Sequence, residues 1–388
     1  MNDGNIMHIV IPKERDRNES RVSMLPLNVE KLVKKGAKVT VEAGLGATLG
    51  ISDGEFKKVG AGVEKNRQKL LASGDIVLGL RVPDGKDVSA FKKQSIHISF
   101  LDPFAQKPLL AALAKKHISA IAMEMIPRST RAQKMDALSS QASLAGYAAV
   151  VLAADNIQKI FPMMMTPAGT IQPARVFIIG AGVAGLQAIA TARRLGAKID
   201  AFDTRPIAKN DVLSLGAKFV EIDLGETGQT AQGYAKALTE DQLKKQREVM
   251  KQYCAQADVV ITAAQVFGRK APVIVTEDMT EAMKPGSVIV DLAIDSGGNV
   301  EGAVYNKTVV KNGVKIIGLA NMPVRVALNA SQMYSNNLYN LLDEFWDKEK
   351  KEFVLKLDDD IIKSCLITHN GAIVHPAFGP GDKKEKGK

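Results

Sequence analysis

Apolar and polar positions alternate along this chain in the manner of α/β proteins. Short apolar runs, typical of buried strands, are separated by stretches with the 3.6-residue period of amphipathic helices. This alternation indicates βαβ units and parallel sheets. In the first third of the chain the predicted strands are residues 8–11, 38–42, 75–80, 95–100 and 117–123, and the predicted helices include residues 26–34 and 53–59.

A long apolar helix pattern at residues 137–157 leads into a second unit. The prolines that follow, Pro162, Pro167 and Pro173, exclude a continuing helix. The methionine run 163–165 in this connection is expected to pack and to carry no chemistry. The second unit has six predicted strands, the number in a complete doubly wound dinucleotide-binding fold. They are residues 175–179, 198–202, 218–222, 259–263, 287–292 and 314–319, and a further helical pattern covers residues 325–342.

Composition is that of an ordinary soluble globular protein, with 46% hydrophobic and 24% charged residues. At roughly 150 residues per domain, the 388 residues predict two or three domains. The two cysteines and five histidines are scattered, so no metal site is predicted. The longest uncharged, mostly apolar stretch, residues 144–154, is far shorter than the roughly 20 residues of a membrane-spanning helix. The first residues lack the pattern of a signal peptide.

Basic residues outnumber acidic ones, 52 against 42, which gives a net charge of +10. Such an excess favours an anionic partner: a phosphate, an acidic protein or an anionic lipid surface. The basic residues are mixed with acids along the chain, and aromatic residues make up only 5%. A nucleic-acid partner is therefore not predicted.

The strongest motif is the glycine triplet Gly180, Gly182 and Gly185, which follows a predicted strand and opens a predicted helix. In this G-x-G-x-x-G context the first glycine permits a tight turn and the second lets backbone amides approach a pyrophosphate. The third allows close packing of helix on strand, and the helix N-terminus attracts the negative charge. A βαβ turn that merely needs glycines is the alternative. The order strand, triplet, helix, strand favours a dinucleotide site.

An acidic residue, Asp203, closes the next predicted strand, 23 residues after Gly180. A carboxylate there accepts hydrogen bonds from the adenosine ribose hydroxyls and repels a 2′-phosphate, which favours NAD over NADP. Arg205 complicates this choice, because a nearby arginine can accommodate a 2′-phosphate. The prediction remains NAD(H).

The segment 223–239 is longer than an ordinary βα loop and contains Gly225, Gly228, Gly233 and Tyr234. Its composition suits a flap that closes over a bound nucleotide, and a passive insertion is equally consistent with it.

Several segments along nearly the whole chain form specific motifs: PKERDRNESRVSMLP at 12–26, EMIPRSTRAQKMDALSSQASLAGY at 124–147, MMMTPAGTIQPARVFIIGAGVAGLQAIATARRLGA at 163–197, GYAKAL at 233–238, KPGSVIVDLAIDSGG at 284–298 and NGAIVHPA at 370–377. With these motifs the chain resembles the alanine dehydrogenase/pyridine nucleotide transhydrogenase family, and within it the soluble NAD(H)-binding alpha subunit of proton-translocating transhydrogenases.

This resemblance implies that four residues hold the nicotinamide: Arg128, Gln133, Asp136 and Ser139. Arg128 and Asp136 can form a charge-assisted pair, and Asp136 is also a plausible N-cap of the helix that follows. Both roles of Asp136 are compatible. Tyr234 matches the tyrosine of the family's mobile loop. The full predicted cofactor-binding set is Gly180, Gly182, Val183, Ala184, Gly185, Asp203, Thr204, Arg205, Gly233, Tyr234, Ala264 and Gln265.

An alanine dehydrogenase-like amino-acid oxidoreductase is the main alternative. Arg21 matches that group's carboxylate-binding arginine, whereas Arg81 and Asp102 stand where it has a lysine and a histidine. Arginine stays protonated near neutral pH and aspartate is a poor substitute for imidazole, so the acid–base pair is missing. Arg21 is then expected in a structural ion pair. Asp295 is shared across the family and does not discriminate. A non-catalytic NAD-binding regulatory module is the third possibility.

The expected fold is α/β: two Rossmann-like doubly wound parallel-sheet domains joined by long helices, with a cleft between them. One domain comprises residues 1–138 plus 322–388, and the NAD(H)-binding domain comprises residues 139–321. The resemblance implies hydride transfer between NADH bound here and NADP⁺ on a partner domain, coupled to proton translocation by a membrane subunit. It also implies a homodimer that is cytoplasmic and peripheral to the inner membrane of a bacterium.

Overall fold

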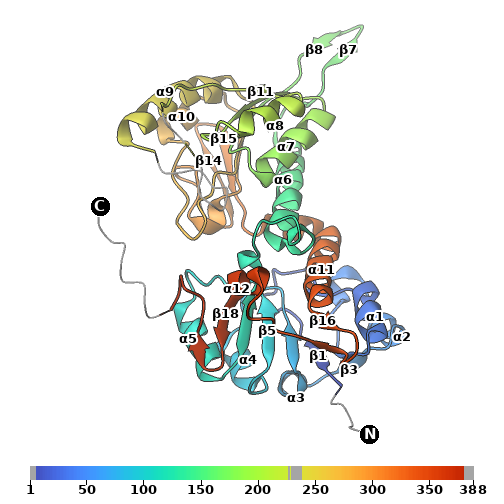
Figure 1. The fold of residues 1–388 in the computed structure, drawn as a ribbon. Helices are drawn as coiled ribbons and strands as arrows, with labels where there is room; N and C mark the ends of the chain where they lie inside the picture. Colours follow the sequence, from blue (N-terminus) through green and yellow to red (C-terminus); the bar gives the residue numbers. More distant parts are fainter. Residues whose placement is uncertain (1–5, 226–227, 229–237, 380–388) are drawn as a thin grey trace. The chain divides into compact units, whose positions relative to one another are not determined.

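The computed structural model describes residues 6–225, 228 and 238–379. The chain forms two compact units, each with its own large sheet (Figure 1). Unit 1 comprises Met1–Gln141 and Val326–Lys388, and unit 2 comprises Ala142–Arg325. Unit 2 is thus inserted into the sequence of unit 1. The divisions fall after residues 141 and 325, and the predicted ones were placed after residues 138 and 321.

The sheet of unit 1 has eight strands in the order β19-β18-β6-β5-β4-β1-β2-β3. Strands β1 to β6 are parallel, and their order is that of a doubly wound fold. The C-terminal strand β18 extends the sheet by pairing antiparallel with β6. The strands are β1 (His8–Ile11), β2 (Lys38–Glu42), β3 (Gly62–Glu64), β4 (Ile76–Leu78), β5 (Ile96–Ser99), β6 (Ser119–Ala122), β18 (Leu366–His369) and β19 (Ala372–Ile373). The helices are α1 (Pro26–Lys34), α2 (Asp53–Lys58), α3 (Arg67–Ser73), α4 (Gly85–Ala90), α5 (Lys107–Lys115), α11 (Ala327–Glu344) and α12 (Asp360–Cys365).

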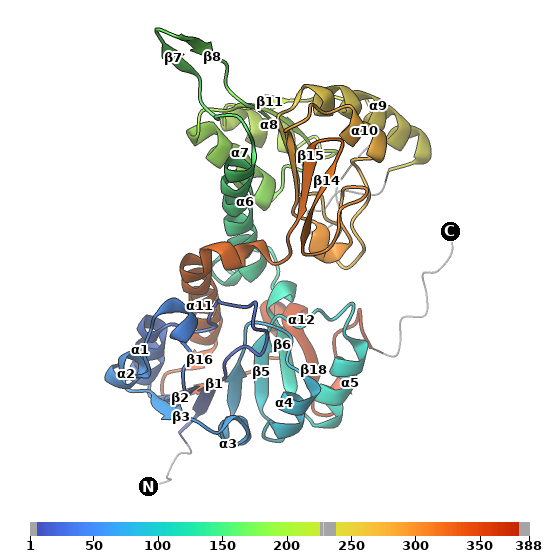
Figure 2. The same cartoon turned by 180° about the vertical axis from the view of Figure 1, so that it is seen from behind.

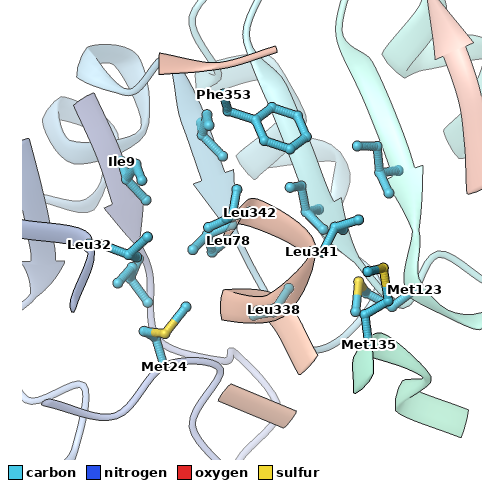
Figure 3. Packing of buried hydrophobic residues seen from close by; sticks show 14 of the residues in the cluster. Ile9, Met24, Leu32, Leu78, Met123, Met135, Leu338, Leu341, Leu342 and Phe353 are labelled. Atoms are coloured by element: carbon cyan, nitrogen blue, oxygen red, sulfur yellow. The ribbon is translucent and has the colours of Figure 1, made fainter. Parts of the chain in front are cut away.

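Helix α11 contributes to the core of unit 1, although nearly 200 residues separate it from the preceding part of that unit. Its leucines Leu338, Leu341 and Leu342 are fully buried in one cluster with Ile9 of β1 and Leu78 of β4 (Figure 3). Burying a leucine side chain contributes roughly 2 kcal/mol. The first domain therefore depends on both of its sequence segments.

The main sheet of unit 2 has seven strands in the order β11-β10-β9-β12-β13-β15-β14. Six are parallel and follow the 3-2-1-4-5-6 order of dinucleotide-binding folds, which confirms the predicted fold class. They are β9 (Arg175–Ile179), β10 (Lys198–Phe202), β11 (Lys218–Phe219), β12 (Val259–Thr262), β13 (Val288–Asp291) and β15 (Val314–Gly318), with antiparallel β14 (Lys307–Lys311) at the edge. The helices are α7 (Val183–Arg194), α8 (Ala208–Ser214), α9 (Glu240–Gln256) and α10 (Glu277–Glu281).

Helix α6 (Ala137–Asn156) continues from unit 1 into unit 2. Among the described residues it is the one helix long and apolar enough to cross a membrane, judged by length and composition. Half of it is buried within the protein. Its residues Ala148, Ala149 and Leu152 belong to the core of unit 2, and Gly146 lies against the backbone of Ala184. The buried core helix of a soluble protein meets the same criteria of length and apolar composition as α6.

The expectation that the methionine run is packed is wrong. Met163, Met164 and Met165 are exposed, Met165 by 73%. The last two open an exposed hairpin formed by β7 (Met164–Thr166) and β8 (Gly169–Ile171), which extends from the rest of unit 2 (Figure 2). A second small hairpin, β16 (Trp346–Asp347) with β17 (Glu352–Phe353), belongs to unit 1.

Candidate dinucleotide-binding site

The order in which the chain adds strands to the sheet of unit 2 reverses between β9 and β12. From β9 the chain proceeds to β10 on one side, and β12 lies on the other. The loops that leave the carboxyl ends of these two strands diverge, and such a switch point is where open α/β sheets bind ligands. Gly180 follows β9 and Ala263 follows β12, so these loops form the walls of the candidate site.

Each glycine of the triplet meets a different requirement. Gly180 has a φ of +95°, and a Cβ there would lie 2.9 Å from the backbone of Ala263 and Ala264. A Cβ on Gly185 would lie 1.8 Å from the carbonyl oxygen of Gly180. At Gly182, by contrast, the nearest atom to a Cβ is the Arg205 guanidinium at 4.0 Å. The protein needs the first and third glycines to fold, and the second leaves space open.

That space lies at the N-terminus of helix α7, whose first two residues are Val183 and Ala184. Gly182 is the N-cap, and its carbonyl oxygen accepts the Leu186 amide at 2.8 Å. The first amides of a helix have no intrahelical partner and carry partial positive charge. A diphosphate fits this arrangement because it needs N–H donors, positive potential and room for close backbone approach.

Asp203 lies directly after β10, and its side chain is 6% exposed. One carboxylate oxygen accepts the Ala181 amide at 2.8 Å, which ties the glycine loop to the end of β10. Arg205 donates to both carboxylate oxygens, through Nε at 2.9 Å and Nη2 at 2.8 Å. The backbone amide of Arg205 also donates to the Asp203 Oδ1, at 2.8 Å. These four donors occupy the carboxylate, so a ribose hydroxyl would exchange with a guanidinium donor.

This pairing bears on the choice between NAD and NADP. Arg205 is held against Asp203 and also donates to the Ala181 carbonyl at 3.2 Å. A guanidinium neutralised by a carboxylate attracts a 2′-phosphate weakly, and the carboxylate itself repels one. The arrangement favours NAD. Thr204, which stands between Asp203 and Arg205 in the sequence, is half-buried.

Ala264 and Gln265 follow β12 on the other wall of the site. Both backbone groups of Ala264 are hydrogen-bonded to the side chain of Asn299, a residue that no sequence motif selects. Gln265 is exposed, and its amide donates to the Leu292 carbonyl at 3.2 Å. Gly233 and Tyr234 lie outside the described residues, as does most of the segment predicted to form a flap.

The four predicted nicotinamide residues lie in unit 1, around the start of helix α6. Asp136 caps this helix, because its Oδ1 accepts the Ser139 amide at 2.9 Å. Its Oδ2 accepts the Ser139 hydroxyl at 2.6 Å. Arg128 and Gln133 are exposed. The structure thus joins Asp136 to Ser139 and leaves two long polar side chains at the surface of unit 1.

The corresponding switch point of unit 1, between β1 and β4, contains one of the chain's own carboxyl groups, that of Glu14. Glu14 accepts the Leu80 amide at 2.8 Å and the Arg81 amide at 3.3 Å. The residue is partly exposed, yet its carboxyl group is enclosed, and this burial raises its pKa to about 7. Burial likewise raises the pKa of Glu124 to about 7, although the amides of Leu101 and Asp102 oppose the shift.

Arg21 forms a buried ion pair, as expected from the sequence. Glu19 accepts its Nη2 at 2.6 Å and its Nε at 2.8 Å, and both side chains are nearly inaccessible. The Arg21 Nη1 donates to Gln141 at 2.8 Å.

Asp295 accepts the Asn321 amide at 2.9 Å. Cys254 and Cys365 are buried free thiols, and burial raises the pKa of each to about 12. Among the described residues, no three His, Cys, Asp or Glu side chains gather as a metal site.

A doubly wound sheet with a glycine loop and a helix N-terminus at its switch point defines a dinucleotide-binding protein. Comparisons with known proteins agree. Residues 10–145 match the family model "Alanine dehydrogenase/PNT, N-terminal domain", and residues 149–376 match its C-terminal counterpart. The chain therefore belongs to the alanine dehydrogenase/pyridine nucleotide transhydrogenase family, as its motifs predicted.

Within this family the chain resembles transhydrogenase alpha subunits. It is 46% identical over 379 residues to an NAD(P) transhydrogenase alpha subunit chain of Rhodospirillum rubrum, covering 96% of this chain and 99% of that one. A transhydrogenase structure from Sinorhizobium meliloti matches with a TM-score of 0.83 at 41% identity, covering 96% and 100% of the two chains. An L-alanine dehydrogenase structure matches with a TM-score of 0.79 at 26% identity, covering 96% and 98%.

Proposed function

We propose that this chain binds NAD(H) at the switch point of unit 2 and exchanges a hydride with NADP(H) held by a partner subunit. The observation that carries the proposal is the open space over Gly182 at the N-terminus of α7, next to the Asp203 carboxylate. The names of the relatives, NAD(P) transhydrogenase alpha subunits and a transhydrogenase structure, support the reaction. The acceptor NADP⁺ belongs to the proposal.

In the proposed complex, the α7 amides and Gly182 bind the pyrophosphate, and Asp203 binds the adenosine ribose in exchange for a donor from Arg205. The mononucleotide halves of a doubly wound sheet lie on either side of the switch point. The nicotinamide half is then on the β12 side, beside Ala264 and Gln265. By the family resemblance, Arg128, Gln133, Asp136 and Ser139 hold the carboxamide and ring.

The cofactor supplies the hydride, and the reaction consumes no proton at the carbon centres. The protein's own task is therefore to hold and orient the nicotinamide and to exclude water. Asp136 is suited to orienting a carboxamide, because its carboxylate is itself fixed by Ser139. No acid–base dyad is needed, which agrees with the absence of the lysine and histidine of alanine dehydrogenases at Arg81 and Asp102.

The proposed assembly includes a membrane-embedded subunit that couples hydride transfer to proton translocation, an NADP(H)-binding subunit and a second copy of this chain. The designation of the relatives as alpha subunits supports the existence of partner subunits. In this proposal the chain is cytoplasmic and attached to the inner membrane face through its partners. The net charge of +10 suits an acidic partner or an anionic lipid surface, and weaker assembly at high salt would support that role.

Amino-acid oxidation is the competing function, since the family includes alanine dehydrogenases. The buried pairing of Arg21 with Glu19 argues against it, because this guanidinium already binds a carboxylate of its own chain.

Nucleotide titration and a hydride-transfer assay test the proposal. We expect the isolated chain to bind NADH and not NADPH, and to oxidise NADH only when an NADP⁺-loaded partner subunit is added. NADH oxidation with pyruvate and ammonia would establish the amino-acid reaction instead. NADH binding without activity in either assay would favour a regulatory module.

Asp136→Asn tests the positioning role. Asparagine is as good an N-cap as aspartate, so α6 and NADH affinity should be preserved while hydride transfer slows at least about tenfold, a barrier increase of about 1.4 kcal/mol. Stopped-flow transfer with the partner subunit measures the rate, and thermal unfolding checks the cap. An unchanged rate would reduce Asp136 to a helix cap.

A further inference from the structure

One buried residue closes the loop that follows β12. Asn299 is fully buried, and both donors of its side-chain amide are used: Nδ2 donates to the carbonyls of Ala264 and Pro272, each at 2.8 Å. Its Oδ1 accepts the Ala264 amide at 3.1 Å. Its backbone carbonyl accepts the amides of Ile274 at 2.8 Å and Val275 at 2.9 Å. Both ends of the segment 264–275 are therefore attached to Asn299.

Asn299 is in turn held by Asp291, at the end of β13. The Asp291 Oδ2 accepts the backbone amide of Asn299 at 2.8 Å, and the Asp291 Oδ1 accepts the Thr262 hydroxyl at 3.0 Å. Gly298 has a φ of +82°, and a Cβ there would lie 2.9 Å from the same carboxylate. The turn before Asn299 thus requires glycine to bring the asparagine onto Asp291.

The loop attached to Asn299 forms one wall of the switch point. The backbone of Ala263 and Ala264 lies so close to Gly180 that only a glycine fits there. A small displacement of this loop would enter the space of the glycine turn. Because Asn299 occupies both backbone groups of Ala264, the loop offers a fixed shape at that point, and Gln265 is the next side chain exposed to a ligand.

We propose that Asn299, anchored by Asp291, is a positioning residue that holds the loop 264–275 in the shape that accepts the nicotinamide half of NAD(H). This inference rests on the proposed function. The adenosine half depends on the other wall, with Asp203 and α7, which Asn299 does not contact through its side chain. Asn299 should therefore affect the two halves of the nucleotide unequally.

The test compares NADH with 5′-AMP in the full chain. Asn299→Ala removes all three side-chain hydrogen bonds, and the isosteric Asn299→Asp removes both donors. We expect the dissociation constant for NADH to rise about tenfold or more in each variant, the loss that accompanies one or two hydrogen bonds. The constant for 5′-AMP should change less than about twofold.

Asp258→Ala is the matched control. Asp258 is also buried and lies directly before β12, at its opposite end, where it accepts the Arg175 amide at 2.8 Å and the Lys159 ammonium at 2.7 Å. This variant should lower the unfolding temperature while both nucleotides bind as in wild type. Unchanged NADH affinity in the Asn299 variants, or equal losses for NADH and 5′-AMP, would overturn the proposal.

Hydrogen exchange separates this inference from the proposed function. In nucleotide-free protein the Ala264 amide should exchange at least about tenfold faster in Asn299→Ala than in wild type or Asp258→Ala, as expected for a loop released from its attachment. Unchanged exchange would refute the attachment. If wild-type protein bound neither nucleotide, the proposed function would fail, and the exchange result would still decide whether Asn299 holds the loop.

Discussion

The parallel strands of the two sheets follow the same order, and the two sheets differ at their switch points. In unit 2 the chain turns on Gly180 and enters α7 at once, which leaves backbone amides and free space at the sheet edge. In unit 1 the first helix starts only at Pro26, and the intervening segment places Glu14 on the amides that follow β4. The fold provides an edge of free backbone amides twice, and in unit 1 a carboxyl group of the chain itself occupies it.

Substitutions in the glycine triplet test this contrast with the largest expected effect. Gly185→Ala forces a Cβ within 1.8 Å of a backbone oxygen, so we expect unit 2 to lose more than about 3 kcal/mol and NADH binding to disappear. Gly182→Ala meets no atom closer than 4.0 Å and should leave stability nearly unchanged while NADH affinity falls.

Calorimetry and NADH titration measure the two effects. Gly85→Ala is the control in unit 1, because a Cβ there meets nothing within 4 Å. Wild-type affinity in Gly182→Ala would show that the open space in unit 2 is not where the nucleotide binds.

The Arg21 ion pair gives the second test. Glu19→Ala leaves a buried guanidinium without its carboxylate, which should cost about 3 kcal/mol of stability, with NADH affinity unchanged. Added acetate should restore part of the unfolding temperature by binding Arg21. Glu30→Ala, which removes the exposed pair with Lys34, should cost less than about 0.5 kcal/mol and show no response to acetate. Failure of acetate to stabilise Glu19→Ala would contradict the assignment of the lost stability to the missing Glu19 carboxylate.

The third test uses pH. The pKa of Glu14 is about 7 in the folded protein against 4.5 for the free group, so the folded state holds this proton more tightly. The free energy of unfolding should therefore fall as pH rises from about 4.5 to 7, by about 3 kcal/mol for this group. Glu14→Gln should remove that part of the decline and leave the part due to Glu124. Urea unfolding across this pH range measures the decline. If the decline in Glu14→Gln equals that of wild type, it is due to groups other than Glu14.

The geometry of the glycine loop after β9 could be predicted because local sequence determines it. A tight turn, a close helix packing and a carboxylate at the next strand each require a particular residue type at a fixed spacing, and Gly180, Gly185 and Asp203 satisfy these requirements. The parallel strands of unit 2 were also largely predictable, since most are apolar runs. The exception is β11, which is only Lys218–Phe219 where a strand over residues 218–222 was predicted. β14 was missed because its residues are mostly exposed and lysines begin and end it.

Other features depend on contacts between distant parts of the chain. The ion pair of Arg21 was expected, but segment 12–26 is rich in charge and resembles a solvated loop. The burial of Glu19 and Arg21 depends on the fold, which brings Gln141 to the guanidinium. Asn299 carries no motif, and its role follows only from the fold around it. The exposed methionines show the converse, that an apolar run need not be internal.

The discontinuity of unit 1 has a consequence for the order of events during synthesis. Unit 2 is one continuous segment and can fold once residue 325 has left the ribosome. Unit 1 must wait for α11 and β18, whose residues complete its core and its sheet. At about 5–20 residues per second, the interval between residues 141 and 369 lasts roughly 10–50 s. Nascent chains arrested after residue 325 should therefore contain a protease-resistant unit 2 and a protease-sensitive N-terminal segment that remains exposed to chaperones.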